Sequence, residues 1–293
     1  MFSIQVPATS ANLGPGFDSM GVALSLYLTV EVRETSDTWL VEHPFGKDIP
    51  SNHTNLIVET ALSINPNIEP HHLVCHSTIP MTRGLGSSST AIVAGIELAN
   101  QLGQMNLSDR QKVNFASQFE GHPDNVAPAI LGGLVVAYYA PKKQETFYQK
   151  IDLDSLSFIA VVPNYQLSTK ESRSVLPSQM AFKDAVEASS IANLLVAAFA
   201  NKDYTLAGNL LEMDLFHESY RSPLVAEFQR VRQLAHSMGI EGTFLSGAGP
   251  TIMTILQVHQ AQAFYKACQD DQMLSTNCQI YKLQVDHEGL MVR

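Results

Sequence analysis

The sequence predicts an α+β fold in which sheets are packed with helices. Residues 22–34 alternate between apolar and polar side chains as a strand does, whereas residues 91–102 are apolar with helical spacing. Strands and helices do not follow a strict β-α-β order, and residues 243–256 predict a strand, a turn and a second strand. A chain of 293 residues is long enough for one large domain or two of ordinary size.

The first third of the chain is expected to be rich in strands. Residues 2–6 alternate as a strand, and the Gly-, Pro-, Asn- and Ser-rich residues 7–21 predict a loop. A long strand follows at 22–34, and a short one at 38–42 contains the only tryptophan, Trp39. The stretch from Asn52 to Asn55 can cap a helix over 56–64, and residues 72–79 form a strand that leads into a glycine-rich loop.

Helices dominate the middle of the chain. Residues 91–102 and residues 109–119, the second group after a Ser108 cap, are expected to be helical. Asp124 can cap a short helix that reaches residue 130, and residues 134–139 form a strand. Polar residues at 142–151 interrupt the apolar pattern. We therefore divide the chain into domains of residues 1–150 and 151–293.

The second half combines buried strands with amphipathic helices. Residues 157–162 predict a buried strand, 166–175 a polar loop and 180–200 an Ala-rich helix. Helices are expected at 205–213 and at 224–238, the latter with Pro223 in its first turn. Beyond the pair of strands at 243–256, a helix at 261–268 and a closing strand at 279–285 complete the prediction.

Composition limits the class of partner and the compartment. The formal charge of −10, from 18 basic and 28 acidic residues, opposes nonspecific nucleic-acid binding. Hydrophobic residues make up 45%, but no apolar run is long enough to span a membrane and no signal peptide begins the chain. Cys75, Cys268 and Cys278 are widely spaced, which indicates neither a disulfide framework nor a zinc site. We expect a soluble, cytoplasmic protein.

The most informative stretch is IPMTRGLGSSST, residues 79–90, which runs directly into the helix predicted at 91–102. Gly84 and Gly86 allow the backbone to approach a ligand closely, and three serines supply hydroxyls and capping groups. Unpaired N–H groups at a helix start bind phosphate. The stretch lacks the Gly-Lys-Ser/Thr of a Walker A loop and the Gly-x-Gly-x-x-Gly of dinucleotide sites. The alternative is a Gly/Ser-rich turn without a ligand.

The pattern PxxxGLGSSS, from Pro80 to Ser89, resembles the phosphate loop of the GHMP small-molecule kinases. The resemblance implies two α+β lobes, an active site between them, ATP as phosphoryl donor and, from family habit, a homodimer. The nucleotide-binding residues that it implies are Asn55, Pro80, Met81, Thr82, Arg83, Gly84, Leu85, Gly86, Ser87, Ser88, Ser89 and Thr90. Asn55 can face the adenine edge, but a helix N-cap explains this residue equally well.

A chain with no lysine in its phosphate loop needs Mg²⁺ to neutralise the charge on the transferred phosphoryl group. Mg²⁺ prefers few protein ligands together with phosphates and water. By resemblance to the family, Ser87 or Ser88 supplies a hydroxyl and Glu120 a carboxylate. The alternative for Glu120 is an ordinary solvated residue at a helix end.

The amino-terminal string ATSANLGPGFDSMG looks like the signature of homoserine kinases in particular. The resemblance implies that Asn12 and Asp18 hold the hydroxyl end of the substrate, although turn and cap roles are alternatives. His122, Asp124 and Asn125 resemble the string that contacts the amino acid, and Asn125 stands where sister kinases carry a carboxylate base. Many family members have more residues between the glutamate and the histidine, whereas Gly121 alone separates Glu120 from His122 here.

An amino-acid substrate carries a carboxylate, which the planar fork of arginine matches. Arg173 and Arg221 are the leading candidates, and surface solvation is the alternative for each. Thr169 can line the site near the transferred phosphate. The resemblance, together with these residue types, implies catalytic positions at Asp18, Asn125 and Thr169, and substrate contacts at Asn12, Asp18, His122, Asp124, Arg173 and Arg221.

A second glycine motif, SGAGPT at residues 246–251, lies between two apolar strands. A tight hairpin explains it, but its likeness to the carboxy-terminal GHMP motif implies a turn that packs against the phosphate loop. Taken together, the motifs predict ATP-dependent phosphorylation of the hydroxyl of L-homoserine, in threonine biosynthesis. The alternatives are another GHMP kinase, such as a mevalonate-type enzyme, and a non-catalytic nucleotide or amino-acid binding protein.

Overall fold

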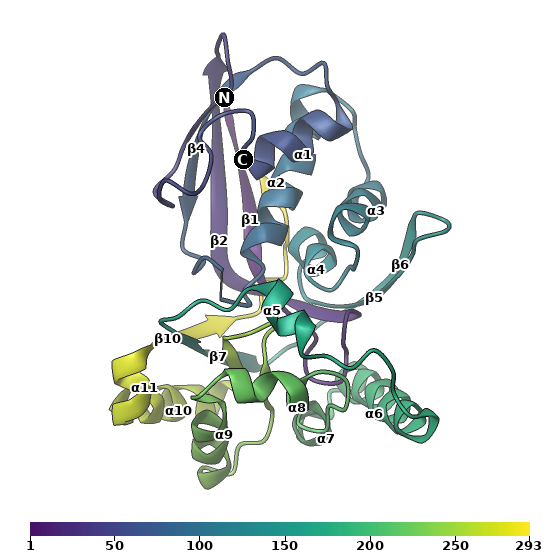
Figure 1. Ribbon diagram of the computed structural model, residues 1–293, viewed down its shortest axis with the longest axis vertical. Coiled ribbons are helices and arrows are strands. Elements are labelled where there is room, and N and C mark those ends of the chain that lie inside the picture. The colour runs from purple at the N-terminus through teal and green to yellow at the C-terminus, as the bar shows by residue number, and fades with distance from the viewer.

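The computed structural model describes residues 1–293 and arranges them around two β-sheets (Figure 1). The seven-stranded first sheet contains, in spatial order, β11 (Met291–Val292), β1 (Phe2–Ala11), β2 (Met20–Thr35), β4 (His71–Ser77) and β3 (Leu40–Glu42), while β5 (Leu134–Ala140) pairs with β2 and carries β6 (Glu145–Ile151). The second sheet contains, in spatial order, β10 (Cys278–Gln284), β7 (Leu156–Pro163), β9 (Ile252–Gln257) and β8 (Thr243–Leu245). All pairings are antiparallel except that of β3 with β4.

Helices are divided between the two sheets. The helices beside the first sheet are α1 (Leu56–Ile64), α2 (Ser87–Leu102), α3 (Asp109–Glu120) and α4 (Val126–Leu131). Those around the second sheet are α5 (Thr169–Ser174), α6 (Phe182–Ala200), α7 (Tyr204–Leu211), α8 (Glu218–Arg221), a 3₁₀ turn (Ser222–Leu224), α9 (Phe228–Ser237), α10 (Val258–Asp270) and α11 (Gln272–Asn277). Figure 1 shows α5 lying between the two groups, where the two halves of the molecule meet.

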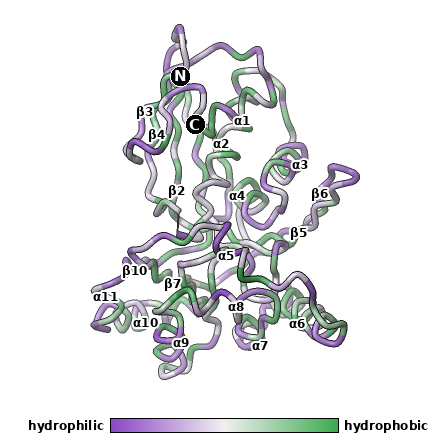
Figure 2. Tube along the Cα trace, viewed as in Figure 1, coloured by the Kyte–Doolittle hydropathy of each residue, from purple (hydrophilic) through white to green (hydrophobic).

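The larger apolar core continues from the first sheet into the second half of the molecule. Ile4 and Ile96 belong to the same cluster of buried side chains as Phe199 and Phe244. A smaller cluster lies between β7, β9 and the helices α9 and α10. Figure 2 shows the consequence along the chain: α2 is apolar over much of its length, whereas the loop between β5 and β6 is hydrophilic.

The loop predicted at residues 7–21 was too long. Strand β1 continues to Ala11 because Pro7–Ala11 pairs with Tyr27–Gly21 of β2, with a register shift after Pro7. Only residues 12–19 remain outside the strands. The shorter loop is held at both ends by paired strands, which fixes the position of its polar side chains.

The polar residues at 142–151, which interrupt the apolar pattern of the sequence, do not end the first sheet. Residues Glu145–Ile151 form β6, which pairs with Leu134–Ala140 over its whole length, and their polar side chains belong to a hairpin that extends away from the core (Figure 1). The domain division at residues 150 and 151 stays a prediction. The carboxy-terminal residues return to the first sheet, where β11 pairs with β1.

The polar loop predicted at 166–175 contains a helix. Ser168 and Glu171 form a reciprocal capping box that starts α5. The helix predicted at 224–238 instead begins at Phe228, after the 3₁₀ turn, and α8 and α11 were not predicted. Asp124 does not cap the following helix; the N-cap residue of α4 is Asn125, which makes no capping hydrogen bond with its side chain.

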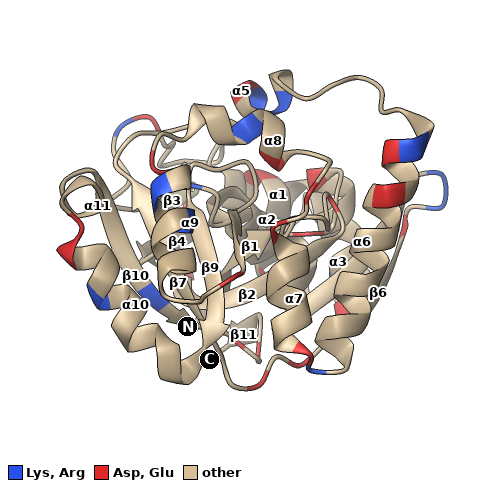
Figure 3. Ribbon diagram, turned by 90° about the horizontal axis from the view of Figure 1, so that it is seen from below, with Lys and Arg blue, Asp and Glu red and all other residues tan.

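No helix of the structure is long and apolar enough to cross a membrane. Figure 3 shows basic and acidic residues next to each other on α5 and at the start of α6. In sequence these are Lys170 beside Glu171 and Lys183 beside Asp184. The charges in this view are therefore mixed and do not form a single basic face.

Candidate active site

A cavity of about 450 Å³ lies where the two halves of the molecule meet. It is lined by the loop after β1, the glycine loop before α2, the segment after α3, helix α5, Arg221 and the turn at residues 247–249. Every residue predicted for the site lines this cavity except Pro80 and Leu85. Leu85 is buried in the core, and its carbonyl accepts a hydrogen bond from the N–H of Thr9.

The glycine loop leaves a group of backbone donors free at the start of α2. Gly86 is the N-cap residue in a left-handed conformation, with φ of 69°. The first backbone bond of the helix runs from Thr90 N to Gly86 O, so the N–H groups of Ser87, Ser88 and Ser89 have no helical partner. The serines do not cap the helix, contrary to the prediction, because no side chain bonds to these donors. They remain available to an anion.

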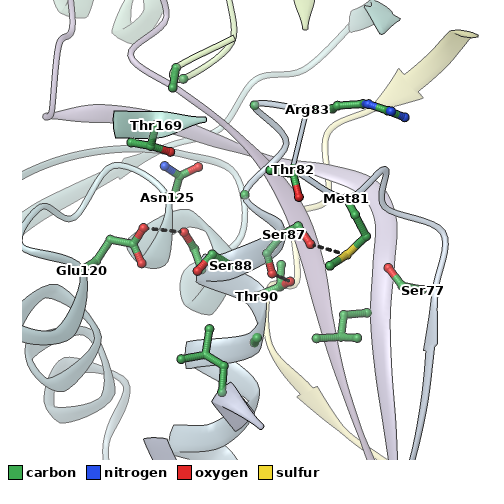
Figure 4. Close-up of a pocket in the computed structure, with 18 of the residues that line it drawn as sticks. Ser77, Met81, Thr82, Arg83, Ser87, Ser88, Thr90, Glu120, Asn125 and Thr169 are labelled. Atoms are coloured by element: carbon green, nitrogen blue, oxygen red, sulfur yellow. Dashed lines mark hydrogen bonds between the residues drawn. The ribbon is translucent and has the colours of Figure 1, made fainter. Parts of the chain in front are cut away.

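The hydroxyls of this loop have different partners (Figure 4). Ser87 Oγ lies 3.0 Å from Met81 Sδ, Thr90 Oγ1 donates to Ser87 O, and Ser89 Oγ donates to Glu120 Oε1 at 3.1 Å. Ser88 is exposed to the cavity and its hydroxyl makes no hydrogen bond. In Figure 4, Glu120, Ser88, Asn125 and Thr169 lie at one end of the close-up, and Met81 and Ser77 lie at the other.

The turn at residues 246–251 packs directly against the glycine loop. Ser246 Oγ donates a hydrogen bond to Gly84 O, and Thr251 Oγ1 donates one to Arg83 O. A Cβ atom at Gly84, whose φ is 49°, would lie 2.2 Å from the carbonyl oxygen of Ser246. Only glycine permits this approach, so the two glycine motifs form one wall of the cavity.

Glu120 ends α3 with its carboxylate turned inward. One oxygen accepts the hydrogen bond from Ser89, while Oε2 is buried and has no hydrogen-bond partner. Burial raises the pKa of Glu120, although His122 and the bond from Ser89 act in the opposite direction. A buried carboxylate oxygen without a partner needs a cation or a donor, and together with the free Ser88 hydroxyl it fits the oxygen ligands that Mg²⁺ takes.

His122, Asp124 and Asp18 form a cluster of titratable side chains in the wall of the cavity. One ligand atom of each lies within 4.8 Å of the others. His122 Nδ1 lies 2.5 Å from Asp124 Oδ1, and the Oδ2 atom of Asp124 makes no hydrogen bond. Burial lowers the pKa of His122, but the bond to Asp124 and the charges of Asp124, Asp18 and Glu120 outweigh burial and raise it overall. The unpaired Oδ2 of Asp124, in the wall of the cavity, remains an acceptor for a positively charged ligand group.

Asn125 is held by its neighbours rather than free to act as a base. Its Oδ1 accepts a hydrogen bond of 2.8 Å from Thr9 Oγ1, and its Nδ2 lies 3.5 Å from Asp124 Oδ1. Asn12 is similarly engaged: its Oδ1 accepts from Asp18 N and its Nδ2 donates to Gly247 O. Both amides hold the walls of the cavity together.

Two arginines reach the cavity from the second half of the chain. Arg173 on α5 donates to Asp18 Oδ1 at 2.8 Å and to Asp18 Oδ2 at 3.4 Å. Arg221, 2% exposed, donates to Ser172 O and Gly247 O and contacts His217 Nδ1. Burial and the nearby positive charge of Arg173 lower the pKa of Arg221 to about 10. Two guanidinium groups that line the same cavity favour an anion between them.

Comparison with known proteins gives the family. Residues 55–133 match the GHMP kinases N terminal domain and residues 195–271 match the GHMP kinases C terminal domain. A homoserine kinase of Streptococcus sanguinis is 50% identical over 289 residues, which cover 99% of each chain. The chain belongs to the homoserine kinase family. Its full-length relatives favour this family over the mevalonate-type alternative and over a non-catalytic binding protein.

Solved structures agree with this assignment to the homoserine kinases. A protein from Listeria monocytogenes is 43% identical with a TM-score of 0.88, and 100% of this chain and 99% of that chain are covered. The homoserine kinase of Cytophaga hutchinsonii is 25% identical with a TM-score of 0.86, covering 100% and 97% of the two chains. The predicted two-part α+β GHMP kinase fold is confirmed. Membership makes the protein a kinase and implies the use of ATP.

Sequence reasoning missed two groups of residues that this homoserine kinase family member brings to the site. Phe45, Ile49, Pro50 and Leu56 form an apolar wall beside Asn55, whose side chain caps α1 through Ile57 N and donates to Pro50 O. Phe45, Ile49 and Pro50 come from a segment without periodic pattern, so no local signal marks them. Phe17 contacts both arginines, and His217 contacts Arg221. The only signal in the sequence is that Phe17 directly precedes Asp18 and that His217 lies shortly before Arg221.

Proposed function

We propose that this protein transfers the γ-phosphoryl group of ATP to the hydroxyl of L-homoserine, giving O-phospho-L-homoserine for threonine biosynthesis. One observation carries the proposal. A single cavity contains unpaired backbone donors at a helix start, a buried carboxylate oxygen without a partner, and two guanidinium groups. These are the groups that a triphosphate, a divalent cation and an amino-acid carboxylate require, in a chain whose full-length relatives are homoserine kinases.

The nucleotide would bind along the glycine loop. Its phosphates would accept hydrogen bonds from the N–H groups of Ser87, Ser88 and Ser89, which have no partner in the helix. The apolar wall of Phe45, Ile49, Pro50 and Leu56 would cover the adenine. Because the Asn55 amide is engaged in its cap and with Pro50 O, we assign it the role of holding this wall in place.

Ser88 and Glu120 would hold Mg²⁺. Ser87 is the other serine predicted as a ligand, and its hydroxyl lies against Met81 Sδ. Ser88 fits because its hydroxyl is free and faces the cavity, and Glu120 fits because its buried Oε2 lacks a donor. When bound, the ion neutralises charge on the phosphates during transfer. Ser89 would orient the carboxylate of Glu120 through the hydrogen bond to Oε1.

The homoserine carboxylate would bind between Arg173 and Arg221, and its amine would bind the free Oδ2 of Asp124. The hydroxyl would lie near Asp18 and Thr169, whose own hydroxyl faces the cavity without a partner. The remaining predicted contacts, Asn12 and His122, would shape the pocket and support Asp124.

Catalysis would depend mainly on orientation and charge neutralisation. Asn125 cannot accept the hydroxyl proton, because an amide is not a base and its oxygen already accepts from Thr9. Asp18 is paired with Arg173. We infer that the hydroxyl is aligned with the γ-phosphorus and that its proton leaves late, to a phosphate oxygen or to solvent.

The direct test measures ADP release by the purified protein with ATP, Mg²⁺ and each of L-homoserine, mevalonate and galactose, and without an acceptor. Homoserine-dependent release is expected to exceed the others by orders of magnitude. Equal release with every acceptor, or none with any, would reject the proposal. Light scattering on a sizing column tests the homodimer, and fractionation of the source cells tests the cytoplasmic location; both are proposals from family habit and composition.

Arg173→Lys tests the carboxylate site. Lysine keeps the charge but loses the planar fork, so the KM for homoserine should rise about tenfold or more while the KM for ATP stays within about twofold. Equal changes in both constants would remove Arg173 from the substrate site. Lys170→Arg, a change of similar type on the same exposed helix α5, is the matched control and should alter neither constant.

A further inference from the structure

An aromatic ring lies against both candidate carboxylate-binding arginines. Phe17, the residue before Asp18, has its ring centroid 5.2 Å from Arg221 Cζ and 5.8 Å from Arg173 Cζ. The same ring stacks on the imidazole of His217, with centroids 5.3 Å apart and planes inclined by 28°. The two guanidinium groups come from α5 and α8, which are far apart in the sequence. Phe17 is therefore the common contact of three site side chains.

The ring of Phe17 lies beside two positive charges that repel each other, those of Arg173 and Arg221. Arg173 and Arg221 are close enough for the charge of one to disfavour the charged form of the other. Asp18 already accepts two hydrogen bonds from Arg173. A second carboxylate placed between the two guanidinium groups would relieve the repulsion further, but it would also occupy the remaining N–H donors that a substrate carboxylate needs. The face of an aromatic ring attracts cations without accepting those hydrogen bonds. Phe17 can thus hold both guanidinium groups without occupying the N–H donors that Asp18, His217 and the backbone leave free for a ligand.

His217 contacts Arg221 and connects it to the loop after β1. The imidazole is fully buried; its Nε2 lies 3.1 Å from Gly14 O, and its Nδ1 lies 3.3 Å from Arg221 Nη1. A carbonyl oxygen only accepts and a guanidinium N–H only donates, so Nε2 carries the proton and Nδ1 accepts. This neutral tautomer links Arg221 to the loop that contains Phe17. Burial lowers the pKa of His217, which agrees with the neutral form.

The loop itself is pressed against the second half of the chain. A Cβ atom at Gly14 would lie 2.1 Å from Leu211 O, and Asn12 Nδ2 donates to Gly247 O. Ring and imidazole therefore meet at a fixed separation, and little freedom remains for the arginine that they contact. The packing of the loop therefore restricts the position of the Arg221 side chain.

We propose that Phe17 and His217 are positioning residues for Arg173 and Arg221, and that they set the selectivity of the site for an acceptor alcohol that carries a carboxylate. The inference rests on the proposed function. It adds that the two arginines bind a carboxylate well only while the ring and the neutral imidazole hold their guanidinium planes.

The first experiment compares Phe17→Leu, Phe17→Tyr and Phe216→Leu in the full chain. Leucine removes the aromatic face, so the KM for L-homoserine should rise about tenfold with the KM for ATP within about twofold. Tyrosine retains the face and should keep the homoserine KM within about threefold of the unmodified protein. Phe216 stacks on Phe17 at 6.4 Å but lies over neither arginine, so Phe216→Leu should leave the homoserine KM near its starting value.

The second experiment uses two amides that each replace one nitrogen of the imidazole. In His217→Asn the amide oxygen can take the position of Nδ1 and accept from Arg221, whereas in His217→Gln the amide reaches the Nε2 position and bonds Gly14 O. The homoserine KM should rise more in His217→Gln than in His217→Asn. The opposite order would overturn the role given to Nδ1. If thermal melting shows that neither variant folds, the Phe17 series decides alone.

These outcomes separate the inference from the function on which it rests. An unmodified protein that releases no ADP with homoserine would refute the proposed function, and this inference with it. If the unmodified protein turns over homoserine and Phe17→Leu leaves its KM unchanged, or changes the KM for ATP equally, the positioning role is wrong and the function stands.

Discussion

The contact between the two glycine motifs predicts that Gly84→Ala lowers kcat/KM strongly, while the loss of stability leaves the protein folded. A left-handed alanine costs about 1 kcal/mol. The new Cβ would also lie 2.2 Å from Ser246 O, closer than the 3.0 Å that real Cβ contacts respect, so the loop and the turn must separate by about 1 Å. Separation weakens the hydrogen bonds from Ser246 and Thr251, each worth about 1 kcal/mol.

The expected loss of stability is therefore about 3 kcal/mol. Because the donors that face the phosphates move with the loop, kcat/KM should fall about 100-fold, which corresponds to about 2.7 kcal/mol of transition-state stabilisation. Gly239→Ala is the matched control. Its φ is 69°, nothing lies within 4 Å of the added atom, and it does not line the cavity. It should cost about 1 kcal/mol of stability and leave kcat/KM within about twofold.

The assay combines urea unfolding with ADP release at saturating homoserine and varied ATP. If Gly84→Ala retains activity within a few-fold of the unmodified protein, the two motifs do not hold the phosphate donors in place. A similar loss of activity in Gly239→Ala would show that general destabilisation, and not the loop, causes the effect.

Two further predictions concern buried carboxylates. Glu120→Ala should lower kcat and raise the Mg²⁺ concentration needed for half-maximal rate, since the free Oε2 is lost; an unchanged Mg²⁺ titration would require another ligand. Burial raises the pKa of Glu218 from 4.5 to about 7, despite its pairing with Arg232. Between these values the folded protein holds a proton that the unfolded chain has released, so stability falls as pH rises through this window, by at most about 3 kcal/mol. Glu218→Gln should remove this part of the slope in urea unfolding at pH 5 and pH 8, and parallel curves for the two proteins would contradict it.

Features encoded in consecutive residues could be predicted from the sequence. A glycine loop between a strand and a helix is a local pattern, so the segment around Gly84 and Gly86 and the start of α2 were recognisable before any fold was known. Ser108 and Gln111 form the capping box that begins α3, again within four residues. Ser168 and Glu171 carry the equivalent signal, but the residues around them are polar, so the composition of this segment predicts a loop.

Features that depend on distant residues could not be predicted. Asp18 and Arg173 are 155 residues apart, and no local pattern indicates that they pair. The serines of the glycine loop look like capping residues, but Gly86 takes the N-cap position because Thr9 and Asn125 leave no room for a side chain there. Strand β1 extends past Pro7 because β2 is available as a partner, which overrides the loop composition.

The return of residues 291–293 to the first sheet has a consequence for biosynthesis. Ser3 and Arg293 exchange backbone hydrogen bonds in both directions, and Ile4 is opposite Val292. A ribosome adds about 5 to 20 residues per second. The outer edge of β1 therefore stays unpaired for roughly 15 to 60 s before β11 is synthesised. During translation that edge is open to other nascent chains. Chaperones that bind exposed strands are therefore expected to contact this protein until residues 291–293 emerge from the ribosome.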